Sequence, residues 1–229
     1  MYFYSASNRL SRLRLRELEI VKQSSKKLHL SDLVISSKTN SMKGKSDSST
    51  RWLRRQAKVD CGASPGSWMQ VALQRIKCNK NKNSGIVIAV DLLEIKDIPG
   101  CITLSSCDFT HSDVQQRIMQ FLPHGQADVV MSDMAPLSTG NKKLDHSKII
   151  DLNRAALEFA RTVLSNGGCF LCKLWDGNET GEFIEEISES FSLCKQVKPK
   201  ASRVDSSELY IFSKGFIKNE NITKKRTRK

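Results

Sequence analysis

From residue 57 onward, short apolar runs alternate with longer segments whose apolar residues recur every three or four positions. Short runs bounded by turn residues indicate buried strands, and the longer period indicates amphipathic helices. The strand-like runs are Ile86–Val90, Cys101–Leu104, Asp128–Met131, Cys169–Leu174 and Leu209–Phe212, with a shorter one before Gly62. Strands separated by single helices predict an α/β fold, with a parallel sheet and helices on both faces. In this class, ligands bind beyond the carboxyl ends of the strands.

Three helices are predicted from apolar residues that share one face at helical spacing. Two glycines, Gly167 and Gly168, follow the second helix and are expected to end it, because glycine is common just past a helix C-terminus. At 229 residues, the chain suits one such domain with flexible ends. The shared faces consist of Trp68, Val71, Ala72 and Ile76; of Ile149, Leu152, Ala156, Phe159, Ala160 and Val163; and of Phe183, Ile184, Ile187 and Phe191.

The formal net charge of +13 is concentrated at the two ends of the chain. Residues 1–58 hold 14 Lys and Arg against 4 Asp and Glu, and residues 218–229 hold 6 against 1. The stretch between them is close to neutral. Basic ends suit a polyanionic partner, most simply nucleic acid, although a targeting leader and a solvated tail would have the same composition.

The first 16 residues contain four Arg, three Ser and two Tyr, and no acidic residue precedes Glu17. This composition is typical of a mitochondrial presequence, and also of a merely basic N-terminus. Residues 36–50 are rich in Ser, Lys and Thr and predict a flexible connection. We therefore expect a basic, flexible leader over 1–50, a folded domain over 51–217 and a basic tail over 218–229.

The seven cysteines, an odd number, lie mostly inside apolar runs, which indicates free buried thiols and not a disulfide framework. Cys169 and Cys172 form a CxxC motif, but residues three apart in a strand point to opposite faces. These two thiols cannot easily share a metal ion, and no metal site is expected. No apolar run approaches the length of about 18 residues that a membrane-spanning helix needs.

Two features at predicted strand ends indicate a nucleoside-containing ligand. Residues 60–68, Asp-Cys-Gly-Ala-Ser-Pro-Gly-Ser-Trp, follow a short strand and open a helix, and Gly62 and Gly66 allow the backbone to approach a ligand closely. The loop matches neither GxGxxG nor a P-loop. Asp91 ends the second strand, where an acid can accept hydrogen bonds from both hydroxyls of a ribose. The pattern admits NAD or S-adenosylmethionine, and each feature alone also fits an ordinary turn.

Further charged residues follow the next strands, over the same expected cleft. Asp108 could bond an adenine amino group or could be an ordinary turn acid, whereas Asp133 lies just past the fourth strand. Lys173 ends the fifth strand, and a lysine inside an apolar strand is costly unless it is paired or functional. Asp133 is its natural partner. Lys173 could act as a general base, and Glu208 at the start of the last strand offers a second carboxylate.

Six sequence motifs occur in order between about residues 57 and 216. They are GASPGSW at 62–68, VDL at 90–92, SDMAP at 132–136, DH at 145–146, FLCK at 170–173 and KPKASR…SSELY at 198–210. Together they closely resemble the FtsJ-like (RrmJ) ribosomal RNA 2′-O-ribose methyltransferases. The DCGASPGSW loop and the LPHGQAD segment before SDMAP are most similar to the mitochondrial branch.

This resemblance implies a Rossmann-like, S-adenosylmethionine-dependent methyltransferase fold: a mostly parallel seven-stranded sheet with an antiparallel last strand. The family has a Lys-Asp-Lys-Glu active-site set, whose last three members fall on Asp133, Lys173 and Glu208. Lys173 would be the base on the ribose hydroxyl, and the methyl group would move by direct displacement, with no metal needed. The residues implied in S-adenosylmethionine binding are Pro65, Gly66, Ser67, Trp68, Asp91, Asp108 and Asp133.

The implied substrate is a ribose 2′-hydroxyl, expected on a uridine, in large-subunit ribosomal RNA or a pre-ribosomal particle. Lys198, Lys200 and Arg203, together with the basic ends, are expected to contact phosphates. The implied location is the mitochondrion, with the nucleolus and the cytoplasm as alternatives.

The N-terminal part departs from the family pattern. The first family lysine has only a partial match at Lys27, too far from Asp60, and residues 54–60 are more polar than the family's first strand. Two alternatives therefore stay open. One is a catalytically inactive RNA-binding or ribosome-assembly scaffold of the same fold. The other is a nicotinamide dehydrogenase, against which the glycine loop and Lys173 argue.

Overall fold

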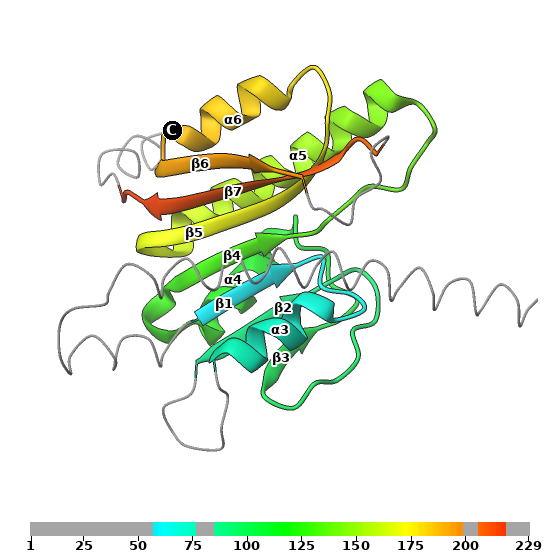
Figure 1. Ribbon diagram of the computed structural model, residues 1–229. Helices are drawn as coiled ribbons and strands as arrows, with labels where there is room; N and C mark the ends of the chain where they lie inside the picture. Colours follow the sequence, from blue (N-terminus) through cyan, green and yellow to red (C-terminus); the bar gives the residue numbers. More distant parts are fainter. Residues whose placement is uncertain (1–56, 77–84, 199–205, 219–229) are drawn as a thin grey trace, which may run out of the picture.

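The computed structural model describes residues 57–76, 85–198 and 206–218, which form one seven-stranded sheet with helices on both faces (Figure 1). None of the described helices is long and apolar enough to cross a membrane. The helices are α3 (Ser67–Ile76), α4 (Ser112–Phe121), α5 (Lys142–Val163) and α6 (Thr180–Ser188), with a 3-10 turn η1 (Pro123–Gly125). The strands are β1 (Ala57–Cys61), β2 (Ile86–Val90), β3 (Cys101–Leu104), β4 (Ala127–Ser132), β5 (Leu164–Trp175), β6 (Phe191–Val197) and β7 (Glu208–Phe216).

The strands lie in the order β3-β2-β1-β4-β5-β7-β6. The first five are parallel to one another, and β7 runs antiparallel to both β5 and β6. The expected mostly parallel seven-stranded sheet with an antiparallel last strand is confirmed. The chain winds outward from β1 to β3 and then crosses to β4 on the other side of β1. Open α/β sheets bind ligands at such a reversal, beyond the carboxyl ends of the strands.

The sheet separates two apolar clusters. Residues of α4, α5 and α6 pack on one face, and residues of α3 pack on the other. Cys172 belongs to the first cluster and Cys169 to the second, so the CxxC thiols point to opposite faces as predicted. β1 is buried along its whole length, and even Lys58 and Asp60 have no exposed surface. The polar first strand is therefore a central strand, paired with β2 and β4.

The prediction that Gly167 and Gly168 end the long helix is wrong. α5 ends at Val163 with Leu164 as its C-cap, and the chain enters β5 directly. The glycines lie where the β4–β5 register shifts, and Gly167 has a φ of +76°. Because that left-handed conformation favours glycine, the two glycines allow the irregular backbone at this point of β5.

The prediction that Phe191 continues a helical face is also wrong. α6 ends at Ser188, and Phe191 is the first residue of β6. Its ring packs 6.3 Å from that of Phe170 and 5.4 Å from that of Phe216. The rest of β6 is largely exposed because the strand lies at the edge of the sheet. Because an edge strand has few buried positions, β6 has no apolar run that would predict it from the sequence.

Candidate functional site

A cavity of about 250 Å³ lies beyond the carboxyl ends of the strands around the β1–β4 boundary. Four of the predicted site residues line it: Asp91, Asp108 and Asp133, which follow β2, β3 and β4, and Lys173, which lies two residues before the end of β5. The structure thus brings the predicted cofactor acids together with the predicted base. The rest of the wall consists of Gly62, Ser64, Val90, Leu92, Leu93, Cys107, Phe109, Met134, Ala135 and Leu152.

The glycine loop after β1 is held tightly against the segment after β4. Gly62 has a φ of +77°, and its N–H donates to the carbonyl oxygen of Val90 at 2.9 Å. A Cβ atom on Gly62 would lie 2.7 Å from the backbone nitrogen of Met134. Both the backbone conformation and the space therefore require glycine here.

Asp91 connects the glycine loop after β1 with the loop after β2. Its Oδ2 accepts a hydrogen bond from the N–H of Ser64 at 2.8 Å, and its Oδ1 accepts one from the N–H of Leu93 at 2.8 Å. A carboxylate offers about four lone-pair positions, so two remain for a ligand. Asp91 can hold the loops and accept hydroxyl hydrogen bonds at the same time.

Asp108 is held in its ionised form by the residue two positions on. Its Oδ1 accepts hydrogen bonds from the backbone N–H of Thr110 at 2.9 Å and from the Thr110 hydroxyl at 2.7 Å. These bonds lower the pKa of Asp108, and the nearby His111 adds a smaller effect in the same direction. Asp108 therefore presents an acceptor to the cavity.

The predicted cofactor residues Pro65–Trp68 lie beside the cavity but are not part of its wall. Pro65 is half-buried, whereas Gly66, Ser67 and Trp68 are buried where α3 begins. The indole ring of Trp68 packs 6.1 Å from the ring of Tyr210. The residues of the glycine loop that do line the cavity are Gly62 and Ser64.

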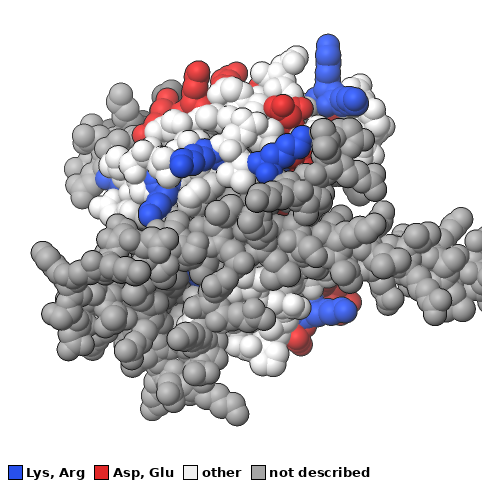
Figure 2. All heavy atoms as spheres, viewed as in Figure 1, with Lys and Arg blue, Asp and Glu red and all other residues white. Residues whose placement is uncertain are grey.

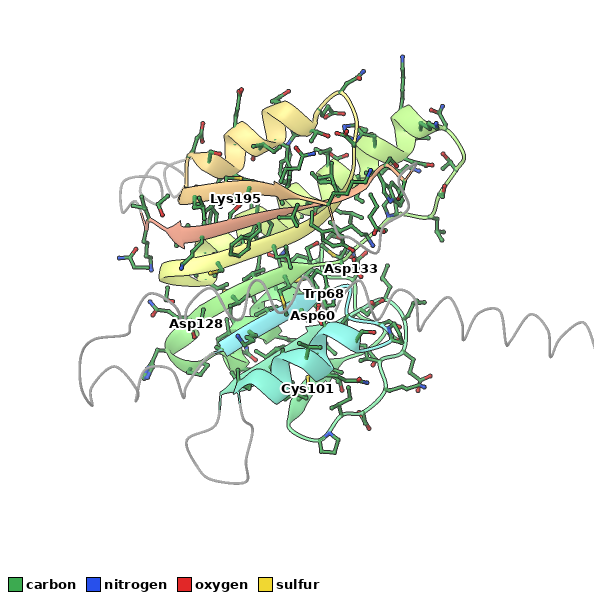
Figure 3. All side chains as sticks on the ribbon, in the orientation of Figure 1. Asp60, Trp68, Cys101, Asp128, Asp133 and Lys195 are labelled. Carbon is green, nitrogen blue, oxygen red and sulfur yellow. The ribbon has the colours of Figure 1, made fainter. Side chains whose placement is uncertain are left out.

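Lys173 and Asp133 form the ion pair that the sequence suggested. The Nζ atom of Lys173 lies 3.0 Å from Oδ1 of Asp133 and also donates to the Asp133 carbonyl oxygen at 2.9 Å. The two side chains are only 13% and 4% exposed, so water screens the pair weakly. Figure 3 shows Asp133 at the end of β4, near the middle of the sheet. The ammonium group is thus held by two oxygens of one residue.

The third predicted catalytic residue, Glu208, is at the start of β7, outside the cavity wall. It pairs in register with Trp175, and Tyr210 pairs with Lys173. Burial, and then the charges of Asp133 and Glu208, raise the pKa of Tyr210. Tyr210 therefore lies near both carboxylates. The sequence prediction did not include it, although its place two residues after Glu208 puts both on one face of the strand.

The Asp-His pair at the start of α5 holds the loops that follow β4 and β5. Asp145 accepts hydrogen bonds from four groups of Ser138, Thr139 and Gly140. His146 donates from Nδ1 to the carbonyl oxygen of Trp175 at 2.8 Å, and its Nε2 accepts from the N–H of Glu179 at 3.0 Å. One helix turn therefore anchors both loops at this edge of the sheet.

Several predicted residues lie outside the described part of the chain. They include Lys27, Lys200 and Arg203, the leader over 1–50 and most of the tail over 218–229. Within the described residues, no group of three His, Cys, Asp or Glu side chains is placed to hold a metal ion.

Comparison with known proteins relates the chain to methyltransferases. A family model described as FtsJ-like methyltransferase matches residues 38–216. A ribosomal RNA large subunit methyltransferase E from Xanthobacter autotrophicus is 44% identical over 171 residues, which are 74% of this chain and 66% of that protein. The mitochondrial rRNA methyltransferase 2 of Caenorhabditis elegans is 42% identical over 164 residues, which are 70% of this chain and 74% of that protein. The chain thus spans slightly less than two thirds of the length of the Xanthobacter protein.

A solved structure agrees with these relatives. A ribosomal RNA methyltransferase from Plasmodium falciparum superimposes with a TM-score of 0.62 at 25% identity. The match covers 74% of this chain and 92% of that one.

Proposed function

Because the chain belongs to the FtsJ-like methyltransferase family, we propose that it transfers a methyl group from S-adenosylmethionine to a ribose 2′-hydroxyl of large-subunit ribosomal RNA, with a uridine as the target. The bacterial and nematode relatives carry names of ribosomal RNA methyltransferases. The observation that carries the proposal is the Lys173–Asp133 ion pair in the wall of the cavity that Asp91 and Asp108 also line. The proposed base and the acids proposed for the cofactor thus line one cavity.

The chemistry of the cavity wall fits S-adenosylmethionine. Asp91 has lone pairs left for ribose hydroxyls, and Asp108 offers an ionised acceptor to an adenine amino group. The carboxylates of the wall also suit a positively charged sulfonium. The bound cofactor supplies a methyl group that is already activated for displacement. The volume of about 250 Å³ is just below the usual range of about 300–1,000 Å³ for ligand sites. We assign Pro65–Trp68 a supporting part in the same site.

Lys173 is the proposed general base. A ribose hydroxyl is a weak acid, so methyl transfer at neutral pH benefits from a group that accepts its proton within hydrogen-bond distance. Nζ of Lys173 first releases its own proton to solvent, and the neutral amine then accepts the proton of the hydroxyl. Asp133 orients Nζ and stabilises the ammonium that results. Glu208 is the proposed second carboxylate, which adds negative potential beside Tyr210.

Two substitutions of Lys173 test this role. Lys173→Ala should lower turnover by about 10²–10⁴-fold, the usual contribution of a general base, and leave cofactor affinity nearly unchanged. Lys173→Arg should be almost as inactive, because arginine keeps its proton. Methyl transfer to ribosomal RNA measures the first quantity, and calorimetry with S-adenosylhomocysteine measures the second. Substantial activity in the arginine variant would mean that the lysine serves only as a positive charge beside Asp133.

Binding titrations of the wild-type chain with ribosomal RNA and with NAD, beside the same assays, separate the other two functions. A wild-type chain that binds ribosomal RNA without methyl transfer would be the inactive scaffold. A chain that binds NAD in place of S-adenosylhomocysteine would be a dehydrogenase.

The surface of the described part favours one face for RNA. Lys195 pairs in register with Phe212 and so lies on the sheet face that carries Lys173 and Tyr210. Lys and Arg side chains gather over β6 and β7, whereas acidic side chains line α6 (Figure 2). Lys195 itself is exposed on β6 (Figure 3), as is Lys198 just after it. We propose that phosphates of the substrate run along this side of β6, together with the basic ends of the chain.

Lys195→Ala tests the RNA face, with Lys148→Ala as a control. Lys148 is an exposed lysine on α5, on the opposite side of the sheet, so both variants lose one positive charge. Removal of one phosphate contact should lower the slope of log affinity against log salt concentration by about 1. We expect this change for Lys195→Ala alone in a filter-binding titration with ribosomal RNA. Equal slopes in the two variants would place the RNA elsewhere.

We also propose a mitochondrial location with a cleaved leader within residues 1–50, on the strength of its composition and of the nematode relative's name. A fluorescent fusion of residues 1–50 should enter mitochondria. Retention in the cytosol would count against the mitochondrial location.

A further inference from the structure

Asn153 is a fully buried polar residue between the two strand ends that carry the ion pair. It lies in α5, and its side chain has no exposed surface. Its Nδ2 donates to the carbonyl oxygen of Lys173 at 2.6 Å, and its Oδ1 accepts from the hydroxyl of Ser132 at 3.0 Å. Ser132 directly precedes Asp133. One amide group thus connects the backbone of one partner with the residue next to the other.

The Asn153 bridge lies where the pairing of β4 with β5 stops. The β4–β5 ladder has its last registered pair at Ser132 and Cys172. Asp133 and Lys173 therefore follow one residue beyond the last pair. No ladder pair fixes their separation there, and the Asn153 side chain spans the same gap from the helix side.

A buried amide is costly unless its hydrogen bonds are made, and an apolar residue would fill the same space in the cluster around α5. Asn153 does not line the cavity, although its neighbour Leu152 does. It therefore has no access to a bound substrate and can act only through the residues that it holds.

We propose that Asn153 is a positioning residue that aligns β5 at Lys173 with the end of β4 and so sets the Lys173–Asp133 geometry. This inference rests on the proposed function for its effect on turnover. The Lys173 ammonium contacts two oxygens of Asp133 within 3.0 Å. A displacement of about 1 Å at such a pair can lower a rate by about 10²-fold.

A set of three variants separates positioning from simple packing. Asn153→Asp keeps the acceptor for Ser132 and loses the donor for Lys173. Asn153→Leu removes both hydrogen bonds. The double variant Ser132→Ala with Asn153→Leu replaces both side-chain partners by apolar groups, which can be nearly neutral for stability. The double variant therefore keeps the test informative even if Asn153→Leu folds poorly.

We expect kcat to fall by about 10- to 100-fold in all three variants, while KM for RNA and the Kd for S-adenosylhomocysteine change by less than about twofold. The double variant should recover the part of the melting temperature that the unpaired Ser132 hydroxyl costs, but not kcat. Recovery of both would assign Asn153 to packing alone and overturn the inference.

A crystal structure of the double variant makes the test independent of activity. We expect the distance from Lys173 Nζ to Asp133 Oδ1 to open from 3.0 Å to more than about 4 Å, the limit of an ion pair. An unchanged distance would overturn the inference. If the wild-type chain shows no methyl transfer but this distance opens, the proposed function fails and the positioning role stands.

Discussion

The two sides of the cavity are held together in different ways. The donor side, where we propose that the methyl donor binds, consists of the loops 62–64, 91–93 and 107–109 after β1, β2 and β3. It is fixed mainly by backbone groups: Asp91 accepts from two N–H groups, and Gly62 bonds to a carbonyl oxygen. The acceptor side, where we propose that the methyl acceptor binds, consists of Asp133, Lys173 and the loop after β4. It depends on side chains from distant elements, since Lys173 and Asp133 are 40 positions apart. The donor side should therefore respond most to changes of backbone conformation, and the acceptor side to single side-chain changes.

The largest effect should come from Gly62→Ala, because this glycine joins the two sides. The added Cβ would meet Met134 backbone atoms at 2.7 and 2.9 Å, and the φ of +77° would be strained as well. Either the glycine loop or the segment after Asp133 must move. We expect a loss of at least about 2 kcal/mol in the free energy of unfolding, together with most of the turnover. Urea titration measures the loss in the free energy of unfolding, and the methyl-transfer assay measures the loss of turnover.

Gly125→Ala is the matched control for this substitution. Gly125 also has a positive φ, of +66°, but a Cβ there would meet nothing within 4 Å. It should lose about 1 kcal/mol from backbone strain alone and keep full turnover. If both variants behave alike, the contact between the glycine loop and Met134 is not what holds the two sides together.

A smaller effect, confined to the donor side, is expected from Asp91→Ala. It removes the acceptor of the Ser64 and Leu93 N–H groups and the proposed contact to the cofactor ribose. Affinity for S-adenosylhomocysteine should fall by about 1–3 kcal/mol, while kcat at saturating cofactor changes little. Asp151→Ala removes an exposed acid from α5 and should leave affinity unchanged. Unchanged affinity in the Asp91 variant itself would show that this acid holds only its loops.

On both sides of the cavity, the sequence indicated residues that follow from local rules and missed residues whose places depend on tertiary packing. Asp91 and Gly62 are each recognised from one strand and the loop that follows it, because local backbone rules apply there. Tyr210 and Asn153 were not recognised, since their places depend on the pairing of β5 with β7 and on the packing of α5, which no local pattern contains. The partnership of Lys173 with Asp133 was predictable because a charge in an apolar strand requires a partner.

The elements of the fold also differ in whether a local pattern predicts them. β2 and β4 have apolar runs that predict them, whereas β6 is largely exposed and has no such run. The two glycines after α5 were assigned to a helix end because Gly-Gly commonly occurs there. Their role in the β4–β5 irregularity depends on a register between segments far apart in the chain.

The smallest effect is expected at Asp145, on the acceptor side but away from the ion pair. Its carboxylate accepts hydrogen bonds from the Thr139 hydroxyl at 2.6 Å and the Thr139 N–H at 2.8 Å, and these bonds lower the pKa of Asp145. A group whose pKa is lower in the folded state stabilises the protein above its unfolded pKa, about 4, and loses this contribution as the pH falls further. Asp145→Asn should therefore be less stable than wild type by a constant amount at neutral pH.

That difference should shrink below about pH 4, where the wild-type carboxylate also takes up a proton. Urea titrations of both proteins across this range measure it, and cofactor affinity should stay unchanged because Asp145 contacts only the loop after β4. A fall in cofactor affinity in the Asp145 variant would break the division between the two sides. It would mean that the loop after β4, through Met134 and its contact with Gly62, supports the donor side as well.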